Sequence, residues 1–287
     1  MRALPASLLA ACGLIATACG GTGSGGAAAG QAARAAATTP ASAPASAPSQ
    51  APAQAKSQAH AKPQAVAGPL EGKTIVIDPG HNGGNYRNPT AINRKVNVLT
   101  KWKPCDTTGT ETASHYTEAA FSWDVSNRMV KILTARGAKV KLTRADNNSV
   151  GPCITQRAAI GNKAKADAAI SVHGDGAPAT DHGFHIIMPK KINGPVDPVV
   201  AASSRLGIAV RDAYTKGTGL PYSNYIGSKA LDYRNDLGGL NLSTVPKIFI
   251  ECGNMRNAGD AAKFKDPAFR QRIAVALADG LQHYLKA

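Results

Sequence analysis

Short apolar runs alternate with longer amphipathic segments from residue 71 to the end of the chain. The short runs are typical of buried strands, and the longer segments repeat apolar residues at helical spacing. Strands that alternate with helices predict an α/β fold, here a single domain with a mostly parallel, twisted sheet covered by helices on both faces. We expect strands at 74–78, 139–143, 168–172, 183–188 and 247–251, and helices at 117–136, 154–165, 198–216 and 267–286.

Residues 1–19 have the pattern of a secretory signal peptide. Arg2 supplies a positive charge at the start, and the apolar stretch that follows is too short and too rich in Ala to predict a transmembrane helix. The sequence around Cys19 resembles a bacterial lipoprotein processing site, so Cys19 is a candidate for lipidation, with Cys12 as a second match. Ordinary signal-peptidase cleavage near Ala18 is the alternative.

Residues 20–70 are expected to form a disordered linker ahead of the folded domain at 71–287. Between residues 20 and 68, all but five residues are Gly, Ala, Ser, Thr, Pro or Gln. Such a segment cannot bury enough apolar surface to offset the entropy lost on ordering. The spacing of Ala and Pro predicts an extended tether or a passive spacer.

The chain is strongly basic, with a formal net charge of +15 at pH 7 and a sequence pI of about 9.8. Four of the 33 Lys and Arg residues and none of the 18 acidic residues precede residue 71, which leaves +11 on the folded part. A basic surface predicts an anionic partner. No nucleic-acid motif is present and the chain carries an export signal, so anionic cell-envelope polymers fit better than nucleic acid. Solubility alone is the alternative explanation of the charge.

Four residues of the kind found in metal-dependent hydrolases stand at the ends of predicted elements. His81, His173 and Glu251 each follow a short apolar run, and Glu118 opens the helix expected at 117–136. Ligands bind beyond the carboxyl ends of parallel strands in α/β sheets, so these side chains are expected to converge. Two imidazoles, one carboxylate ligand and one further carboxylate match a hydrolytic zinc site with three protein ligands, an open position for water and a base.

Each of the four residues also has an ordinary explanation when taken alone. His81 follows a Pro-Gly turn and fits a loop residue, Glu118 fits a first-turn glutamate, and His173 fits a packed core histidine. Glu251 ends the run Ile-Phe-Ile, where a charged group is unexpected unless it has a role. Only the combination of all four residues favours a metal-dependent hydrolytic site.

The cysteines predict a disulfide, because an exported protein meets an oxidising environment. Cys105 and Cys153 both lie in polar loops and form the only good pair. Their disulfide would fix the long irregular segment expected at 82–114 and contribute about 2–4 kcal/mol, with two free thiols as the alternative. Cys252 directly follows Glu251, so strand alternation points it into the core, which argues against a cysteine-histidine hydrolase.

Several short motifs carry a family resemblance by their order and spacing. They are Ile75-Val76-Ile77-Asp78-Pro79-Gly80-His81, the helix that Glu118 opens and Gly137 ends, Leu142-Thr143-Arg144-Ala145-Asp146, Arg157 with Ala166-Asp167, Ile170-Ser171-Val172-His173, Val245-Pro246 and Ile250-Glu251-Cys252-Gly253-Asn254. Over the whole folded part, the chain resembles the zinc-dependent N-acetylmuramoyl-L-alanine amidases of the amidase_3 family, including actinobacterial cell-wall amidases.

The resemblance implies that His81, Glu118 and His173 bind Zn²⁺ and that Glu251 is the catalytic carboxylate. It also implies hydrolysis of the amide bond between N-acetylmuramic acid and the L-alanine of the peptidoglycan stem peptide. The segment between His81 and Glu118 departs from the family pattern, because it is long and carries Cys105.

Two other functions stay open on the sequence alone: a zinc peptidase acting on stem peptides, and a non-catalytic wall-binding or activator protein with the same fold. The expected partners are peptidoglycan or muropeptides and, through the basic surface, anionic cell-envelope polymers, and we expect a monomer. The expected location is the cell envelope, periplasmic space or exterior, with a membrane anchor if Cys19 is lipidated. His182 and His185 are expected to line the cleft or to be structural rather than to bind metal.

Overall fold

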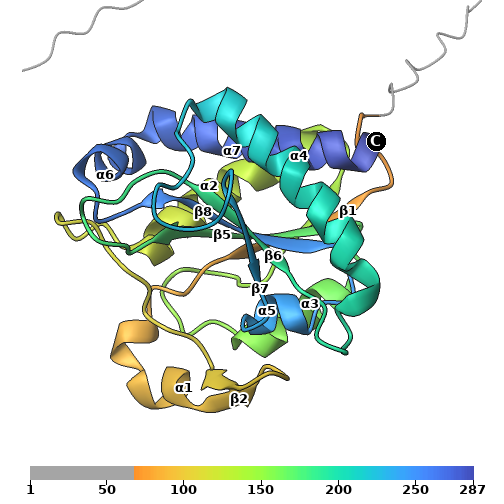
Figure 1. The fold of residues 1–287 in the computed structure, drawn as a ribbon, viewed down its shortest axis with the longest axis horizontal. Coiled ribbons are helices and arrows are strands. Elements are labelled where there is room, and N and C mark those ends of the chain that lie inside the picture. The colour runs from red at the N-terminus through yellow and green to blue at the C-terminus, as the bar shows by residue number, and fades with distance from the viewer. Residues whose placement is uncertain (1–67) are drawn as a thin grey trace, which may run out of the picture. The chain divides into compact units, whose positions relative to one another are not determined.

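The computed structural model describes residues 68–287 (Figure 1). The predicted signal peptide, most of the predicted linker and Cys19 lie outside these residues. Leu70 is fully buried in the core, so the folded part begins slightly before the expected boundary at residue 71. Within the described part of the chain, no helix combines the length and apolar character needed to cross a membrane.

A six-stranded sheet forms the centre of the fold (Figure 1). Strands β1, β4, β5 and β8 run parallel, β6 pairs antiparallel with β8, and β7 pairs parallel with β6. The prediction of a mostly parallel sheet is therefore confirmed, with a reversed pair at one edge. The order across the sheet is β4 (Lys139–Leu142), β1 (Thr74–Pro79), β5 (Ala168–Asp175), β8 (Lys247–Asn254), β6 (His185–Pro189) and β7 (Leu231–Arg234).

Helices cover both faces of the sheet, as expected. The longer helices are α2 (Glu118–Ala135), α3 (Ile154–Lys163), α4 (Val200–Thr218), α6 (Ala258–Lys265) and α7 (Pro267–Lys286), and the shorter ones are α1 (Pro89–Asn93) and α5 (Gly238–Asn241). Helices α2, α4 and α7 pack together on one face, and α3 with α5 lies on the other (Figure 1). Alternation along β1 explains this, because Ile75 and Ile77 join the large core on the first face while Val76 packs with Ala169 on the second.

The structure adds order to the segment that the sequence left irregular. Residues 82–114 contain a short 3-10 helix at Asn85–Arg87, α1 and a hairpin of β2 (Lys95–Asn97) and β3 (Trp102–Pro104). Strand β7 and helix α6 were also not expected. The helix predicted at 198–216 instead spans Val200–Thr218, because a 3-10 turn with Pro198 precedes it.

The β2–β3 hairpin is fixed at both of its ends. Cys105, directly after β3, forms a disulfide with Cys153, which is the N-cap of α3. At the hairpin tip, the Thr100 hydroxyl donates to the Asn235 carbonyl at 2.6 Å, and the Asn241 amide donates to the Val98 carbonyl at 2.8 Å. The hairpin therefore forms a fixed wall beside the carboxyl ends of the central strands.

A buried cluster of charges ties these strands together. Asp78, at the end of β1, accepts hydrogen bonds from Arg157 of α3 and from Lys247 of β8, each at 3.0 Å. All three side chains are about 3% exposed. The hydroxyls of Thr143 and Ser171 also donate to Asp78, at 2.6 and 2.9 Å. One carboxylate thus links β1, α3, β5 and β8 and the residue that follows β4.

Asp78 predicts a specific dependence of stability on pH. Burial raises the pKa of this carboxyl, but Lys247 and Arg157 outweigh burial and hold the pKa well below its usual range. Since the folded pKa lies below the unfolded value of about 3.9, the contribution of Asp78 is complete above that pH and is lost as the pH falls below it. We expect Asp78→Asn to lower the unfolding free energy at pH 7 by about 3–5 kcal/mol, because two buried cations lose their partner.

Denaturant unfolding between pH 2 and 8 measures this effect. At acidic pH, the unfolding free energy of Asp78→Asn should also decrease less than that of the native protein. Asp212→Asn on the exposed face of α4 is the matched control and should behave as the native chain. A native-like stability of Asp78→Asn at pH 7 would contradict the role of this cluster.

Candidate active site

His81 is placed by a constrained turn at the end of β1. The Gly80 N–H donates to the Val172 carbonyl at 3.0 Å, which continues the pairing with β5 for one residue beyond Pro79. His81 itself has φ of +58°, a left-handed conformation that is uncommon for residues other than Gly. Arg157 donates to the His81 carbonyl at 2.9 Å and helps to hold this conformation. The same arginine that pairs with Asp78 therefore also positions His81.

Glu118 is the first residue of α2, where the helix dipole favours a negative charge. It is 4% exposed. Its Oε2 accepts from the Thr110 N–H at 3.0 Å, and its Oε1 accepts from the Gly174 N–H at 3.3 Å. Both carboxylate oxygens are thereby fixed in place.

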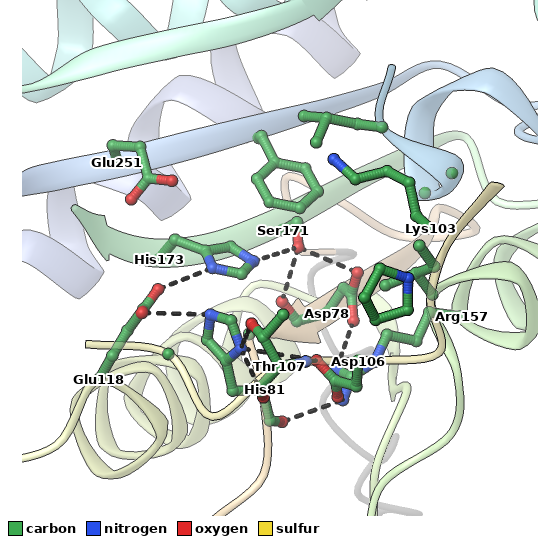
Figure 2. A pocket seen from close by; sticks show the side chains of 18 of the residues that line it. Asp78, His81, Lys103, Asp106, Thr107, Glu118, Arg157, Ser171, His173 and Glu251 are labelled. Atoms are coloured by element: carbon green, nitrogen blue, oxygen red, sulfur yellow. Dashed lines mark hydrogen bonds and ion pairs between the residues drawn. The ribbon is translucent and has the colours of Figure 1, made fainter. Parts of the chain in front are cut away.

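The structure brings His81, Glu118 and His173 together, and their donor atoms lie within 4.8 Å of one another (Figure 2). His81 Nε2 lies 3.1 Å from Glu118 Oε2, and His173 Nδ1 lies 2.8 Å from Glu118 Oε1. The His173 ring stacks on Phe249 with ring centroids 4.3 Å apart. Two imidazoles and one carboxylate converge on one point, which is a donor set that can hold a metal ion.

The outer nitrogens of both histidines have partners, which supports this assignment. His81 Nδ1 lies 3.1 Å from the Thr107 carbonyl and 3.5 Å from Asp106 Oδ1. His173 Nε2 lies 3.2 Å from Ser171 Oγ, whose own proton goes to Asp78. Ser171 Oγ is thus placed to accept a hydrogen bond from the Nε2–H of His173, which leaves the lone pair of Nδ1 facing Glu118. Metal-binding histidines are usually oriented in this way by a second partner.

The electrostatics of this group favour a cation. Burial disfavours a charged His81, but Glu118 and Asp106 outweigh burial and raise the pKa of His81 to about 10. Burial likewise opposes ionisation of Glu118, but His81 and His173 hold the pKa of that carboxyl well below its usual range. The site therefore stabilises a positive charge next to Glu118, which either a proton or a metal ion supplies.

Glu251 lies beside the donor group but is not part of it. It stands on β8 directly opposite His173 of β5 and His185 of β6 in the strand pairing. Its Oε2 is buried without a hydrogen-bond partner among the described residues. Burial, followed by the negative charges of Glu118 and Asp175, raises the pKa of Glu251 well above its usual range. This carboxyl is therefore able to take up a proton.

These groups open into a cavity of about 340 Å³. Figure 2 shows the side chains that line it, with Glu251 projecting from β8 into the same space as His173 and Glu118. Lys103 and Pro104 of the hairpin and the Leu237–Gly239 segment form the opposite wall. A concave site with a few convergent polar groups is typical of a small-ligand or substrate pocket.

The supporting residues were not identified as functional from the sequence. Ser171, Asp106 and Thr107 contact the two histidines, and Arg157 and Lys247 pair with Asp78 behind them. The sequence feature that could have indicated them is a charged residue at the end of an apolar strand, such as Asp78 in the strand before His81 and Lys247 in the strand before Glu251.

Cys252 belongs to the core on the other face of the sheet, as alternation along β8 predicts. His182 is partly exposed, whereas His185 is buried.

Comparisons with known proteins agree with this geometry. The Amidase_3 family model, described as N-acetylmuramoyl-L-alanine amidase, matches residues 75–283. The chain is 36% identical over 217 residues to the N-acetylmuramoyl-L-alanine amidase Rv3717 of Mycobacterium tuberculosis, which covers 75% of this chain and 88% of that protein. Among solved structures, the amidase Ami1 of Mycobacterium smegmatis matches with a TM-score of 0.71 and 35% identity, over 75% of this chain and 98% of that one. Ami1 of Mycobacterium abscessus matches with a TM-score of 0.70 and 38% identity, over 75% and 100%.

The close approach of Gly80 to His173 yields a test of the site geometry. A Cβ at Gly80 would overlap the His173 ring, so Gly80→Ala must displace this imidazole. We expect zinc affinity, measured by titration against a competing chelator, to fall roughly 10- to 100-fold, in the range seen when the support of a metal ligand is lost. Gly161→Ala in α3 is the control, because its Cβ would meet nothing closer than 3.7 Å. Unchanged zinc affinity in Gly80→Ala would contradict the assigned position of His173.

Proposed function

The chain belongs to the N-acetylmuramoyl-L-alanine amidase family and is a peptidoglycan hydrolase, and on this basis we propose how its own residues perform the reaction. His81, Glu118 and His173 hold a zinc ion, and Glu251 is the general base. The bond cleaved is the amide between N-acetylmuramic acid and the L-alanine of the stem peptide.

The observation that supports this proposal is the arrangement of the site. Three metal-ligating side chains lie close together, and a second carboxyl group lies beside them without belonging to the group. Imidazole nitrogens and carboxylate oxygens are typical zinc ligands, and catalytic zinc sites have three protein ligands with one open position. The donor atoms of His81, Glu118 and His173 lie within 4.8 Å of one another, and Glu251 is outside that group. A carboxyl with a buried, unpartnered Oε2 beside such a site suits proton transfer.

Zinc supplies Lewis acidity that polarises the amide carbonyl and makes water a stronger acid. Glu251 accepts the proton that the attacking water releases and passes it to the leaving L-alanine nitrogen. Burial, followed by Glu118 and Asp175, raises the pKa of Glu251, which makes this carboxylate a stronger base than an exposed glutamate. Ser171 and Thr107 hold the two imidazoles in the orientation that keeps their inner nitrogens free.

The two alternative functions fit less well. A non-catalytic wall-binding or activator protein has no need for a carboxyl with a buried, unpartnered oxygen beside three metal donors, because burying that oxygen costs free energy. A zinc peptidase would use the same groups, but the family and the mycobacterial relatives are amidases. The cleaved bond separates these two enzymes, since an amidase releases an intact stem peptide.

We propose a location and partners on the basis of the sequence. The signal pattern at 1–19 supports export to the cell envelope, and a lipid at Cys19 would anchor the linker at the membrane. The charge of +11 on residues 71–287 supports attraction to anionic envelope polymers. We propose that the enzyme acts as a monomer and that this charge helps to retain it near its substrate.

The role of Glu251 is tested by Glu251→Gln in the full chain. We expect zinc content to stay native and turnover of a muramoyl peptide to fall by about 10²- to 10⁴-fold, the usual contribution of a general acid-base group. Glu118→Gln should instead lose zinc. Glu71→Gln, an exposed glutamate before β1, is the matched control. Near-native turnover in Glu251→Gln would show that another group is the base.

A further inference from the structure

The Cys105–Cys153 disulfide joins the two parts of the chain that hold His81. Cys105 begins the segment 105–107, which directly follows β3 and lies outside the helices and strands. Cys153 is the N-cap of α3, and the Arg157 N–H, one turn later, donates to the Cys153 carbonyl at 3.0 Å. Both supports of His81 therefore start at this one covalent link.

The first support is the segment 105–107, which faces the outer nitrogen of the His81 ring (Figure 2). His81 Nδ1 lies 3.1 Å from the Thr107 carbonyl and 3.5 Å from Asp106 Oδ1. These acceptors hold the proton on Nδ1 and leave the lone pair of Nε2 facing Glu118 Oε2, which is 3.1 Å away. The position of 105–107 thus determines which nitrogen of His81 is free to bind a metal ion.

The second support is Arg157, which connects α3 to the same groups. Its Nη2 donates to the His81 carbonyl at 2.9 Å and to Asp106 Oδ2 at 3.0 Å. Arg157 and Asp106 are both buried, so a shift of α3 relative to 105–107 would leave buried charges without their partners. One guanidinium can hold the backbone of His81 and its supporting carboxylate only while α3 and 105–107 keep this relative position.

The disulfide is the covalent constraint on that relative position. Cys105 and Cys153 are 48 positions apart, and α2 and β4 lie between them in the chain. The Ile154 N–H donates to the Cys105 carbonyl at 2.8 Å and aligns the two segments, but a single hydrogen bond contributes less than a cross-link of this length. Loss of the disulfide would therefore loosen 105–107 against α3 directly behind His81.

We propose that the Cys105–Cys153 disulfide positions the His81 imidazole through Asp106 and Thr107, and thereby sets the affinity of the site for zinc. The proposal rests on the proposed function, because it takes His81 as a zinc ligand. It adds a role to the stabilisation that the sequence predicts for this cross-link. Partners of the outer ring nitrogen orient metal-binding histidines in general, and their loss lowers metal affinity.

The burial of the disulfide determines when it acts. Cys105 and Cys153 are each 3% exposed, and thiol–disulfide exchange requires access to the sulfur atoms. The cross-link is therefore made while the chain folds: two thiols give two electrons and two protons to the disulfide of an exchange partner, which becomes two thiols. Such partners belong to oxidising compartments, so a chain that folds before export would bind zinc weakly.

The test removes the disulfide without creating new thiols, because thiolates bind zinc. Cys105→Ala and Cys153→Ser are combined in the full-length protein, since serine is a preferred N-cap residue and preserves the start of α3. We expect the zinc affinity, measured against a competing chelator, to fall roughly 10- to 100-fold. Leu281→Ala in the core of α7 is the control, because it should lower stability and keep the native zinc affinity.

A second readout separates positioning from stability. The visible absorption spectrum of the protein loaded with Co²⁺ in place of zinc reports the geometry of the metal ligands. We expect a changed spectrum in the disulfide-free variant and a native spectrum in Leu281→Ala. A disulfide that only stabilised the fold would leave both spectra native, and that result would overturn the proposal.

Asp106→Ala, with the disulfide intact, tests the path to His81 and does not depend on the folding of the disulfide-free variant. We expect this substitution to lower zinc affinity in the native background and to have little further effect once the disulfide is removed, because both changes act on the same contact. Native zinc affinity in Asp106→Ala or in the disulfide-free variant would overturn the proposal, and fully additive losses would do so too.

Hydrolysis of a muramoyl peptide by the native protein is measured separately and tests the proposed function. If the native protein binds zinc and hydrolyses the peptide while the disulfide-free variant keeps native zinc affinity, the function stands and only the role of the disulfide is lost. A native protein that binds no zinc would contradict both.

Discussion

The catalytic site depends on the ion pairs that the buried carboxylate of Asp78 forms. A negative charge at this depth is stable only because Arg157 and Lys247 pair with it and two hydroxyls donate to it. Arg157 also donates a hydrogen bond to the carbonyl of His81, and the Ser171 hydroxyl is hydrogen-bonded to the ring of His173. The network around Asp78 therefore sets the orientation of both imidazoles.

The two sides of the pocket have opposite electrostatic character. Around His81 the structure favours a positive charge, whereas at Glu251 burial and neighbouring carboxylates favour a neutral group. A cation held by His81, Glu118 and His173 would offset the charge of Glu118, which otherwise opposes ionisation of Glu251. Metal binding and the readiness of Glu251 to act as a base are thus coupled through Glu118.

The positions of the four candidate residues could be predicted because each follows from a local pattern. An apolar run gives a strand, and its carboxyl end gives the location of His81, His173 and Glu251. The supporting contacts could not be predicted in this way, because they join distant residues: Asp78 and Lys247 are 169 positions apart. Strand β7 was missed because its sequence, Leu-Asp-Tyr-Arg, is short and half polar.

The zinc-dependent amidase activity is tested most directly by the products that the full-length protein forms from purified muropeptides, with and without a chelator, read by mass spectrometry. We expect intact stem peptides that begin at L-alanine together with peptide-free muramic acid, a loss of both products with chelator, and recovery on addition of zinc. Shortened peptides still attached to the sugar, or cleavage that the chelator does not affect, would contradict it.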